Sequence, residues 1–306
     1  MGFFKNKYSE LWAGWKILIV LAVFLIATII FSVIFSLAYG VFVVLTSGPI
    51  DPVTLTQRLT NDSVFISLLG ILQNIAVIIS VIVFWKVFDK KPFKDMGLST
   101  FKSGYRDFIY GLVLGAVTIS VVFFVFLFSG QISVVNDFLK PNFSWMLLLN
   151  LVLMIFVGFG EEMFSRGYCM SVLKKSNVIL IFVVPNLIFA LLHILNNEFS
   201  FIPLINIFLV GVLFSFMFNR RGNIWMPIGY HITWNYFQGS IFGLPVSGND
   251  ISGLYTSKLL SENVFNGGGF GPEGGLIVTL IMAVSIALFY LLSRKKSAVT
   301  TADLQT

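Results

Sequence analysis

The sequence predicts an all-α membrane protein, a polytopic bundle of about eight transmembrane helices, and three observations lead to this prediction. Of its 306 residues, 57% are hydrophobic and only 11% are charged, whereas soluble proteins contain about 25% charged residues. Apolar runs long enough to cross a bilayer recur along the chain, and the lysines and arginines collect in short segments between them. These basic segments indicate membrane topology and contacts with lipid headgroups, not a nucleic-acid partner.

Eight apolar runs reach or approach the roughly 20 residues that a helix needs to cross a hydrocarbon core of about 30 Å. They cover residues 17–46, 64–85, 108–129, 144–173, 177–195, 200–218, 224–244 and 276–293. The first run is too long for a cleavable signal peptide and is expected to be the first span. The single cysteine, Cys169, excludes an intrachain disulfide. No internal repeat or soluble segment is evident, so we expect one membrane-embedded domain over 1–306.

The distribution of basic residues predicts that both termini are cytoplasmic and that the chain is a multi-pass protein of the cell membrane. With a cytoplasmic N-terminus, sixteen of the 20 Lys and Arg side chains fall on the cytoplasmic side and only Arg58, Lys140 and Lys258 on the other. Such an asymmetry over short loops is the positive-inside pattern. On the far side, a glycine-rich stretch from about 245 to 275 is expected to be an irregular loop in which Glu273 is solvated.

Two acids and an arginine lie inside the fourth run, where lipid would be expected. Glu161, Glu162 and Arg166 follow an apolar segment, and an ionised side chain inside a spanning helix indicates a functional site. Glu162 and Arg166 are four residues apart and are expected to pair on one helix face. Glu161 is rotated from its neighbour by about 100°, which leaves its carboxylate free to act elsewhere.

The only two histidines, His193 and His231, also fall within predicted spans. A lone histidine on an apolar helix is more often a packing residue, but two of them alongside two buried acids favour a site. Phe189 shares a helix face with His193, as Asn235 does with His231, because each pair is four residues apart. From the helical rise we expect these groups to meet Glu161 in the cytoplasmic half of the bilayer, around a cavity that receives water from the cytoplasm.

The three patterns together resemble those of the CPBP family of intramembrane proteases, also called the Abi or CAAX prenyl protease family. The family motifs are Glu-Glu-x-x-x-Arg, Phe-x-x-x-His and His-x-x-x-Asn/Asp. In this chain they occur in the family's order, over about 144–240, as Glu161-Glu162-Met163-Phe164-Ser165-Arg166, Phe189-Ala190-Leu191-Leu192-His193 and His231-Ile232-Thr233-Trp234-Asn235. The similarity is to a bacterial-type member.

The resemblance implies endopeptidase activity inside the membrane. Glu161 would be the general base toward a water that His193 helps to hold, and His231 with Asn235 would stabilise the oxyanion. Glu162 with Arg166 would shape the site. A carboxylate in an apolar surrounding is suited to this role, since burial raises proton affinity toward the range of a general base. Phe189, and Asn186 one turn before it, are candidates for the substrate cavity.

A zinc site is an alternative to this glutamate chemistry. Glu161, His193 and His231 provide a His₂Glu set of the kind found in some zinc hydrolases, and the family was long described as metalloproteases. The signature His-Glu-x-x-His is absent, however, and the histidines lie on different predicted helices. We therefore expect no obligatory cofactor and keep zinc as the alternative.

Two other functions fit an intramembrane cluster of acids and histidines. One is a non-proteolytic bacteriocin-immunity or binding protein on the same scaffold. The other is a proton-coupled transporter, although no inverted repeat is visible. For a protease, the expected partners are membrane lipids and a membrane-associated protein or peptide, such as a signalling or secreted peptide; prenylated CAAX proteins are the family's eukaryotic substrates.

Overall fold

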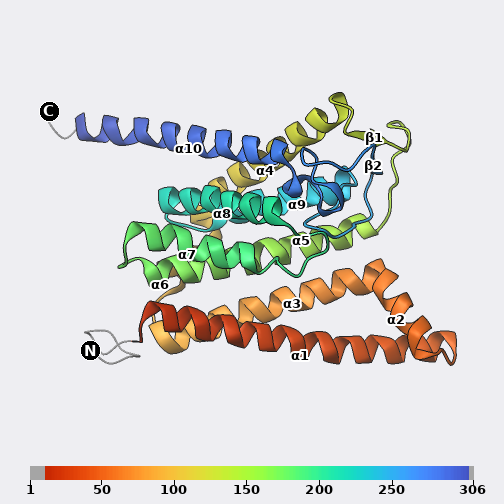
Figure 1. Cartoon of the computed structure of the whole chain (residues 1–306). Helices are drawn as coiled ribbons and strands as arrows, with labels where there is room; N and C mark the ends of the chain where they lie inside the picture. The colour runs from red at the N-terminus through yellow and green to blue at the C-terminus, as the bar shows by residue number, and fades with distance from the viewer. Residues whose placement is uncertain (1–10, 303–306) are drawn as a thin grey trace.

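The chain forms an α-helical bundle in the computed structural model, which describes the backbone of residues 11–302 and the side chains of residues 11–292 (Figure 1). Five helical segments in this part of the chain are long and apolar enough to cross a membrane. Their main helices are α1 (Ala13–Ser47), α3 (Ser63–Phe84), α4 (Phe101–Phe128), α5 (Met146–Glu162) and α8 (Phe201–Arg221). The protein is therefore an all-α multi-pass membrane protein, as predicted.

The three remaining apolar runs are helical too, and the apolar helices Val178–Leu191 and, as far as its side chains are described, Leu276–Leu292 are shorter than the five spans. They form α7 (Val178–Leu191), α9 (Trp225–Asn235) with the π-helix η4 (Tyr236–Ile241), and α10 (Leu276–Ala302). α7 stops before the predicted end at 195 because its last turn tightens. The His193 N–H donates to the Ala190 carbonyl at 3.2 Å, three residues back instead of four. His193 consequently lies in the turn after α7 and not within a helix.

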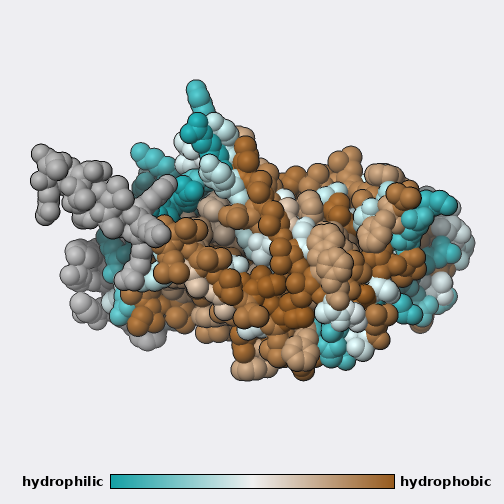
Figure 2. Space-filling view, turned by 90° about the horizontal axis from the view of Figure 1, so that it is seen from above, coloured by the Kyte–Doolittle hydropathy of each residue, from teal (hydrophilic) through white to brown (hydrophobic). Residues whose placement is uncertain are grey.

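The bundle has two chemically different ends. α1 begins and α10 ends at the same end (Figure 1), and the connections on that side carry the basic clusters Lys90-Lys91 and Lys174-Lys175. At the opposite end α2 (Pro52–Asn61) links α1 to α3, and β1 (Ile132–Val134) pairs antiparallel with β2 (Ser257–Leu259). Apolar side chains cover most of the surface between the two ends in Figure 2, as a lipid-facing belt requires.

The glycine-rich segment after η4 is irregular, as predicted, but it is packed into the bundle. It contains two short 3₁₀ turns, η5 (Gly268–Phe270) and η6 (Pro272–Gly274). The prediction that Glu273 is solvated is wrong: the residue is 8% exposed, and its carboxylate accepts hydrogen bonds from Gln238 Nε2 at 2.6 Å and Trp234 Nε1 at 3.5 Å. Burial raises the pKa of Glu273, and these hydrogen bonds oppose that shift.

Close packing of α4 on α9 fixes the position of the helix that carries His231. A Cβ atom at Gly111 would lie 2.1 Å from the Met226 carbonyl oxygen, and one at Gly115 would lie 2.3 Å from that of Tyr230. Small residues let helices in membranes approach until their backbones touch. The α4–α9 contact therefore depends on glycine at these positions.

Replacing Gly111 by Ala should lower the melting temperature of the detergent-solubilised protein, because the new methyl group meets backbone atoms that cannot rotate away. Overpacking of this kind costs about 1–3 kcal/mol. Gly14→Ala is the matched control, since no atom lies within 4 Å of a Cβ at Gly14. Equal melting temperatures for the two variants would show that the α4–α9 contact is not as close as described.

Candidate active site

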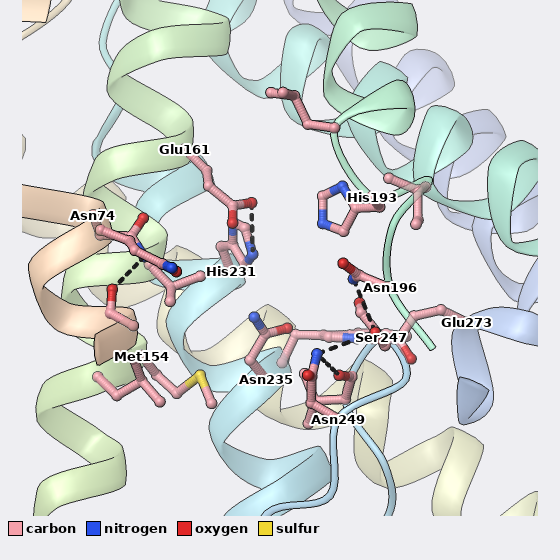
Figure 3. Close-up of a pocket in the computed structure, with 18 of the residues that line it drawn as sticks. Asn74, Met154, Glu161, His193, Asn196, His231, Asn235, Ser247, Asn249 and Glu273 are labelled. Atoms are coloured by element: carbon pink, nitrogen blue, oxygen red, sulfur yellow. Dashed lines mark hydrogen bonds and ion pairs between the residues drawn. The ribbon is translucent and has the colours of Figure 1, made fainter. Parts of the chain in front are cut away.

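A cavity of about 710 Å³ lies between the α1–α3 pair and the helices α5, α7, α8 and α9. Its volume is in the range of small-molecule and cofactor pockets. Four of the predicted site residues, Glu161, His193, His231 and Asn235, contribute to its wall, and Figure 3 shows their side chains around a common space.

Glu162 is the centre of a buried polar network behind the cavity. Its side chain is fully buried, and Oε1 accepts a hydrogen bond from Arg166 Nη1 at 3.0 Å. The same oxygen lies 3.1 Å from Nδ1 of His231 on α9. The chain reaches Arg166 through the π-helix η3 (Met163–Cys169), which continues α5 and leads into α6 (Met170–Leu173). Single π turns within α-helices are frequent at functional sites.

Arg166 is enclosed by groups that suit a buried guanidinium. It is 0% exposed, its Nη2 donates to Asn186 Oδ1 at 3.2 Å, and its Cζ lies 4.6 Å from the ring centre of Phe189 and 5.2 Å from that of Phe214. Cations over aromatic faces are stabilised by the ring quadrupole. The predicted pairing with Glu162 is thus present, and two aromatic rings and an amide reinforce it.

Asn186 does not lie on the cavity wall, in contrast to our expectation for this residue. It is 0% exposed, and its Nδ2 donates to the Phe182 carbonyl at 2.7 Å and to Ser215 Oγ at 3.0 Å. Together with the bond that its Oδ1 accepts from Arg166, these contacts turn the amide into the protein. Phe189 does line the cavity.

Glu161 is the carboxylate that faces the cavity. Its side chain is 28% exposed, and Oε2 lies 3.8 Å from Nε2 of His231. An ionised carboxylate only accepts hydrogen bonds, so the bond between His231 and an ionised Glu162 places a proton on Nδ1 and turns Nε2 toward Glu161. Glu162 therefore orients the imidazole of His231, which lies beside Glu161. The spacing of the motifs had not indicated this contact.

His193 faces Glu161 across the cavity (Figure 3). Its Nδ1 lies 2.9 Å from the carbonyl oxygen of Phe189. A carbonyl only accepts, so Nδ1 carries the proton, and Nε2 of the neutral ring is left as an acceptor. The i,i+4 spacing of Phe189 and His193 thus produces a backbone contact that fixes the tautomer of the histidine.

Asn235 follows His231 by one helical turn and lines the cavity. Its amide makes no hydrogen bond to any other residue within the described part of the chain, so its two N–H donors are available to a guest. Asn74 of α3, which our sequence analysis did not single out, also lines the cavity. A Cβ at Gly160 would lie 2.6 Å from Asn74 Oδ1. In the sequence, Asn74 could have been identified only as part of the polar pair Gln73-Asn74 within an apolar run.

The residues proposed for zinc do not form a ligand set in this arrangement. Within the described residues, no three His, Cys, Asp or Glu side chains are grouped closely enough to hold a metal ion. The Nδ1 contacts of His231 with Glu162 and of His193 with a backbone carbonyl leave Nε2 of both rings free, so they do not bear on this point. Because Glu161, His193 and His231 are not grouped as metal ligands in this arrangement, they do not fit a shared metal here.

The basic end of the bundle is tightly packed. Trp85, Met96 and Tyr168 are each at most 2% exposed, and the rings of Trp85 and Tyr168 meet edge to face at 6.1 Å. The lining of the cavity reaches Ser63 and Asp250, near the end that carries α2 and the β-strands. That the cavity receives water from the cytoplasm stays a prediction.

Arg166→Met should strongly destabilise the protein, since it leaves Glu162 as an unpaired buried charge. Breaking one partner of a buried ion pair costs about 3–5 kcal/mol. The double variant Glu162→Gln, Arg166→Met should have a higher melting temperature than Arg166→Met alone, because the stranded charge is removed. Arg220→Met, at an exposed position, controls for loss of positive charge. A double variant no more stable than Arg166→Met would contradict the pairing.

A comparison with known protein families finds a match for the segment that carries this site. Residues 143–237 match the family model described as type II CAAX prenyl endopeptidase Rce1-like. No curated protein and no solved structure matches the chain. The matched segment runs from the start of α5 past Asn235 and includes all three motifs, close to the predicted extent of 144–240. In this segment, which carries the site, the chain is similar to the Rce1-like type II CAAX prenyl endopeptidase family.

Proposed function

We propose that this protein is an intramembrane endopeptidase that hydrolyses a peptide bond of a membrane-associated protein or peptide with a water activated by Glu161. One observation carries the proposal. The partly exposed carboxylate of Glu161 on α5, the imidazole of His231 on α9 and that of His193 in the turn after α7 share one cavity. Oε2 of Glu161 lies 3.8 Å from Nε2 of His231. The match to an endopeptidase family supports the same reaction class.

In the first step Glu161 takes a proton from a water molecule, and the water oxygen attacks the carbonyl carbon of the substrate. Nε2 of His193, the free acceptor of its ring, holds the second hydrogen of that water. A general base positioned in this way contributes typically 10²–10⁴-fold to the rate. The product of the attack is a tetrahedral intermediate with a negatively charged oxygen.

Donors on α9 stabilise that oxygen. Asn235 supplies an amide N–H, and His231, when both ring nitrogens carry protons, donates from Nδ1 to Glu162 and from Nε2 into the cavity. Hydrogen-bond donors that are already in place in a water-poor site stabilise a developing negative charge more strongly than donors in water do. Glu161 then gives its proton to the leaving nitrogen as the C–N bond breaks, which yields a new carboxyl group and a new amino group.

Because the helices around the cavity have apolar outer surfaces, we expect a substrate that is held at the membrane. We propose a cell-membrane location and a signalling or secreted peptide as substrate. The name of the matched family refers to prenylated CAAX ends. Proteolysis after a prenylated cysteine is therefore one specific form of the proposal.

Glu161→Gln should abolish formation of the cleavage products, because an amide cannot accept a proton from water at neutral pH. Cells that carry the wild-type chain and cells that carry the variant are compared by labelling new N-termini in the membrane and secreted fractions. Glu262→Gln, at an exposed loop position, is the matched control and should retain every product. Identical peptide sets for Glu161→Gln and wild type would reject proteolysis and favour a non-enzymatic binding role or transport.

Chelation should leave the activity unchanged if Glu161 alone activates the water. The reconstituted protein is incubated with 1,10-phenanthroline, and cleavage of a peptide identified in the preceding comparison is measured. We expect this because no three His, Cys, Asp or Glu side chains among the described residues are grouped closely enough to hold a metal ion. Loss of cleavage that added zinc restores would establish the metal-dependent alternative.

A further inference from the structure

We infer that Glu273 forms a subsite of the cavity that binds a positively charged side chain of the substrate, a lysine or an arginine. The residue belongs to the glycine-rich segment between η4 and α10 and contributes to the cavity wall. The nature of the bound group, a substrate side chain, rests on the proposed proteolysis. The binding of a cation can be tested without catalysis.

The charges around the cavity are unbalanced. Its lining, as far as the chain is described, contains three acidic residues, Glu161, Asp250 and Glu273, and no lysine or arginine. Asp250 is exposed to water, and Glu161 lies beside His231. Glu273 is only 8% exposed, and none of the ion pairs among the described residues includes it. Because opposite charges attract more strongly when they are buried, Glu273 is the strongest cation-binding group on the wall.

The surroundings of the Glu273 carboxylate suit a guest that donates hydrogen bonds. Its protein partners Gln238 Nε2, at 2.6 Å, and Trp234 Nε1, at 3.5 Å, are donors. Such bonds favour the ionised form of a carboxyl group, and a cation beside it acts in the same direction. Gln238 Nε2 also donates to the Pro245 carbonyl at 2.6 Å, which fixes the orientation of this amide. Its Oε1 is buried and accepts no hydrogen bond within the described residues.

The backbone that carries Glu273 is anchored from two sides. Nδ2 of Asn206 on α8 donates to the carbonyl oxygens of Glu273 and Gly275 at 2.7 and 2.9 Å. Gly271 has a φ of +93°, and a Cβ there would lie 2.2 Å from the Pro245 carbonyl oxygen. Glycine at 271 thus lets the segment pack against the backbone that Gln238 also contacts. Fixed placement of this kind is what a specificity site requires.

Helix α9 connects Glu273 with the proposed oxyanion donors. Trp234, which donates to Glu273, directly precedes Asn235 and follows His231 by three residues, a rise of about 4.5 Å. Figure 3 shows Glu273 on the opposite side of the cavity from Glu161. A substrate that places a basic side chain at Glu273 therefore extends across the cavity toward Glu161.

Cation binding is tested on the purified full-length protein with Glu161→Gln, which removes the reaction and the carboxylate beside the histidines. The probes are benzamidine, whose amidinium resembles the head group of arginine, and benzamide, its uncharged counterpart. Their dissociation constants are measured by NMR titration. Benzamidine should bind about tenfold more tightly than benzamide, as expected for hydrogen bonds to a charged group. Adding Glu273→Gln should remove this preference, and adding Asp250→Asn should preserve it.

Equal binding of the two probes to the Glu161→Gln protein overturns the inference, as does a preference that survives Glu273→Gln. Asp250→Asn is the matched control, because Asp250 is an exposed acid of the same cavity. It also decides the question if Glu273→Gln does not fold. With positions 161 and 250 neutral, Glu273 is the one carboxylate left in the described lining, so loss of the preference in that protein overturns the inference.

The peptides whose cleavage requires Glu161 test the role of Glu273 toward substrate. They should contain lysine or arginine at one fixed position relative to the cleaved bond. Replacing that residue by norleucine should raise KM about tenfold in the wild type, with kcat little changed, and should have little effect in Glu273→Gln. Glu161-dependent products without such a residue overturn the inference and leave the proteolysis intact. A cation preference that requires Glu273, without any Glu161-dependent product, retains the binding site and removes the proteolysis.

Discussion

The contact of Glu162 with Arg166 and His231 is the constraint on which the site depends. A carboxylate and a guanidinium, both fully buried, are costly to remove from water, and that cost is offset only while every partner is in place. The partners come from different helices. Glu162 and Arg166 lie on the α5–η3 segment, Asn186 on α7 and His231 on α9. The polar network therefore holds these helices in one relative arrangement.

The apolar surroundings of this network are adapted to it. Phe189 and Phe214 present their rings to the Arg166 guanidinium. A Cβ at Gly211 of α8 would lie 3.0 Å from Arg166 Nη2 and 2.8 Å from Asn186 Oδ1. Glycine at 211 thus lets α8 cover the charged group closely enough to exclude water, which makes each hydrogen bond to it stronger.

The orientation of the reactive groups follows from contacts outside the cavity. Glu162 holds one nitrogen of His231, and the Phe189 carbonyl holds one nitrogen of His193. In both rings the other nitrogen is left for the cavity. Hydrogen bonds of this kind, made behind the atoms that face the cavity, would hold the proposed catalytic groups close to one geometry.

The sequence was informative where neighbours lie on one helix. Spacing of four residues predicted the Glu162–Arg166 pair, and the apolar runs predicted the helices. The helical rise predicted that Glu161 and the two histidines meet around one cavity, and they do. The individual contacts between helices were not predicted: the bond from His231 to Glu162, the position of Asn74, and the burial of Asn186 away from the cavity. The edge-to-face contact of Trp85 with Tyr168 is likewise a contact between segments that no periodicity encodes.

The claim that Glu161 activates a water for direct attack is tested most directly by a single turnover in H₂¹⁸O. The reconstituted protein is used in excess over a peptide whose cleavage requires Glu161, and the new carboxyl terminus is analysed by mass spectrometry. Direct attack predicts one ¹⁸O atom in that carboxyl group in the first turnover. Product without ¹⁸O would mean that a protein group, not water, attacks the peptide bond, and would contradict the account.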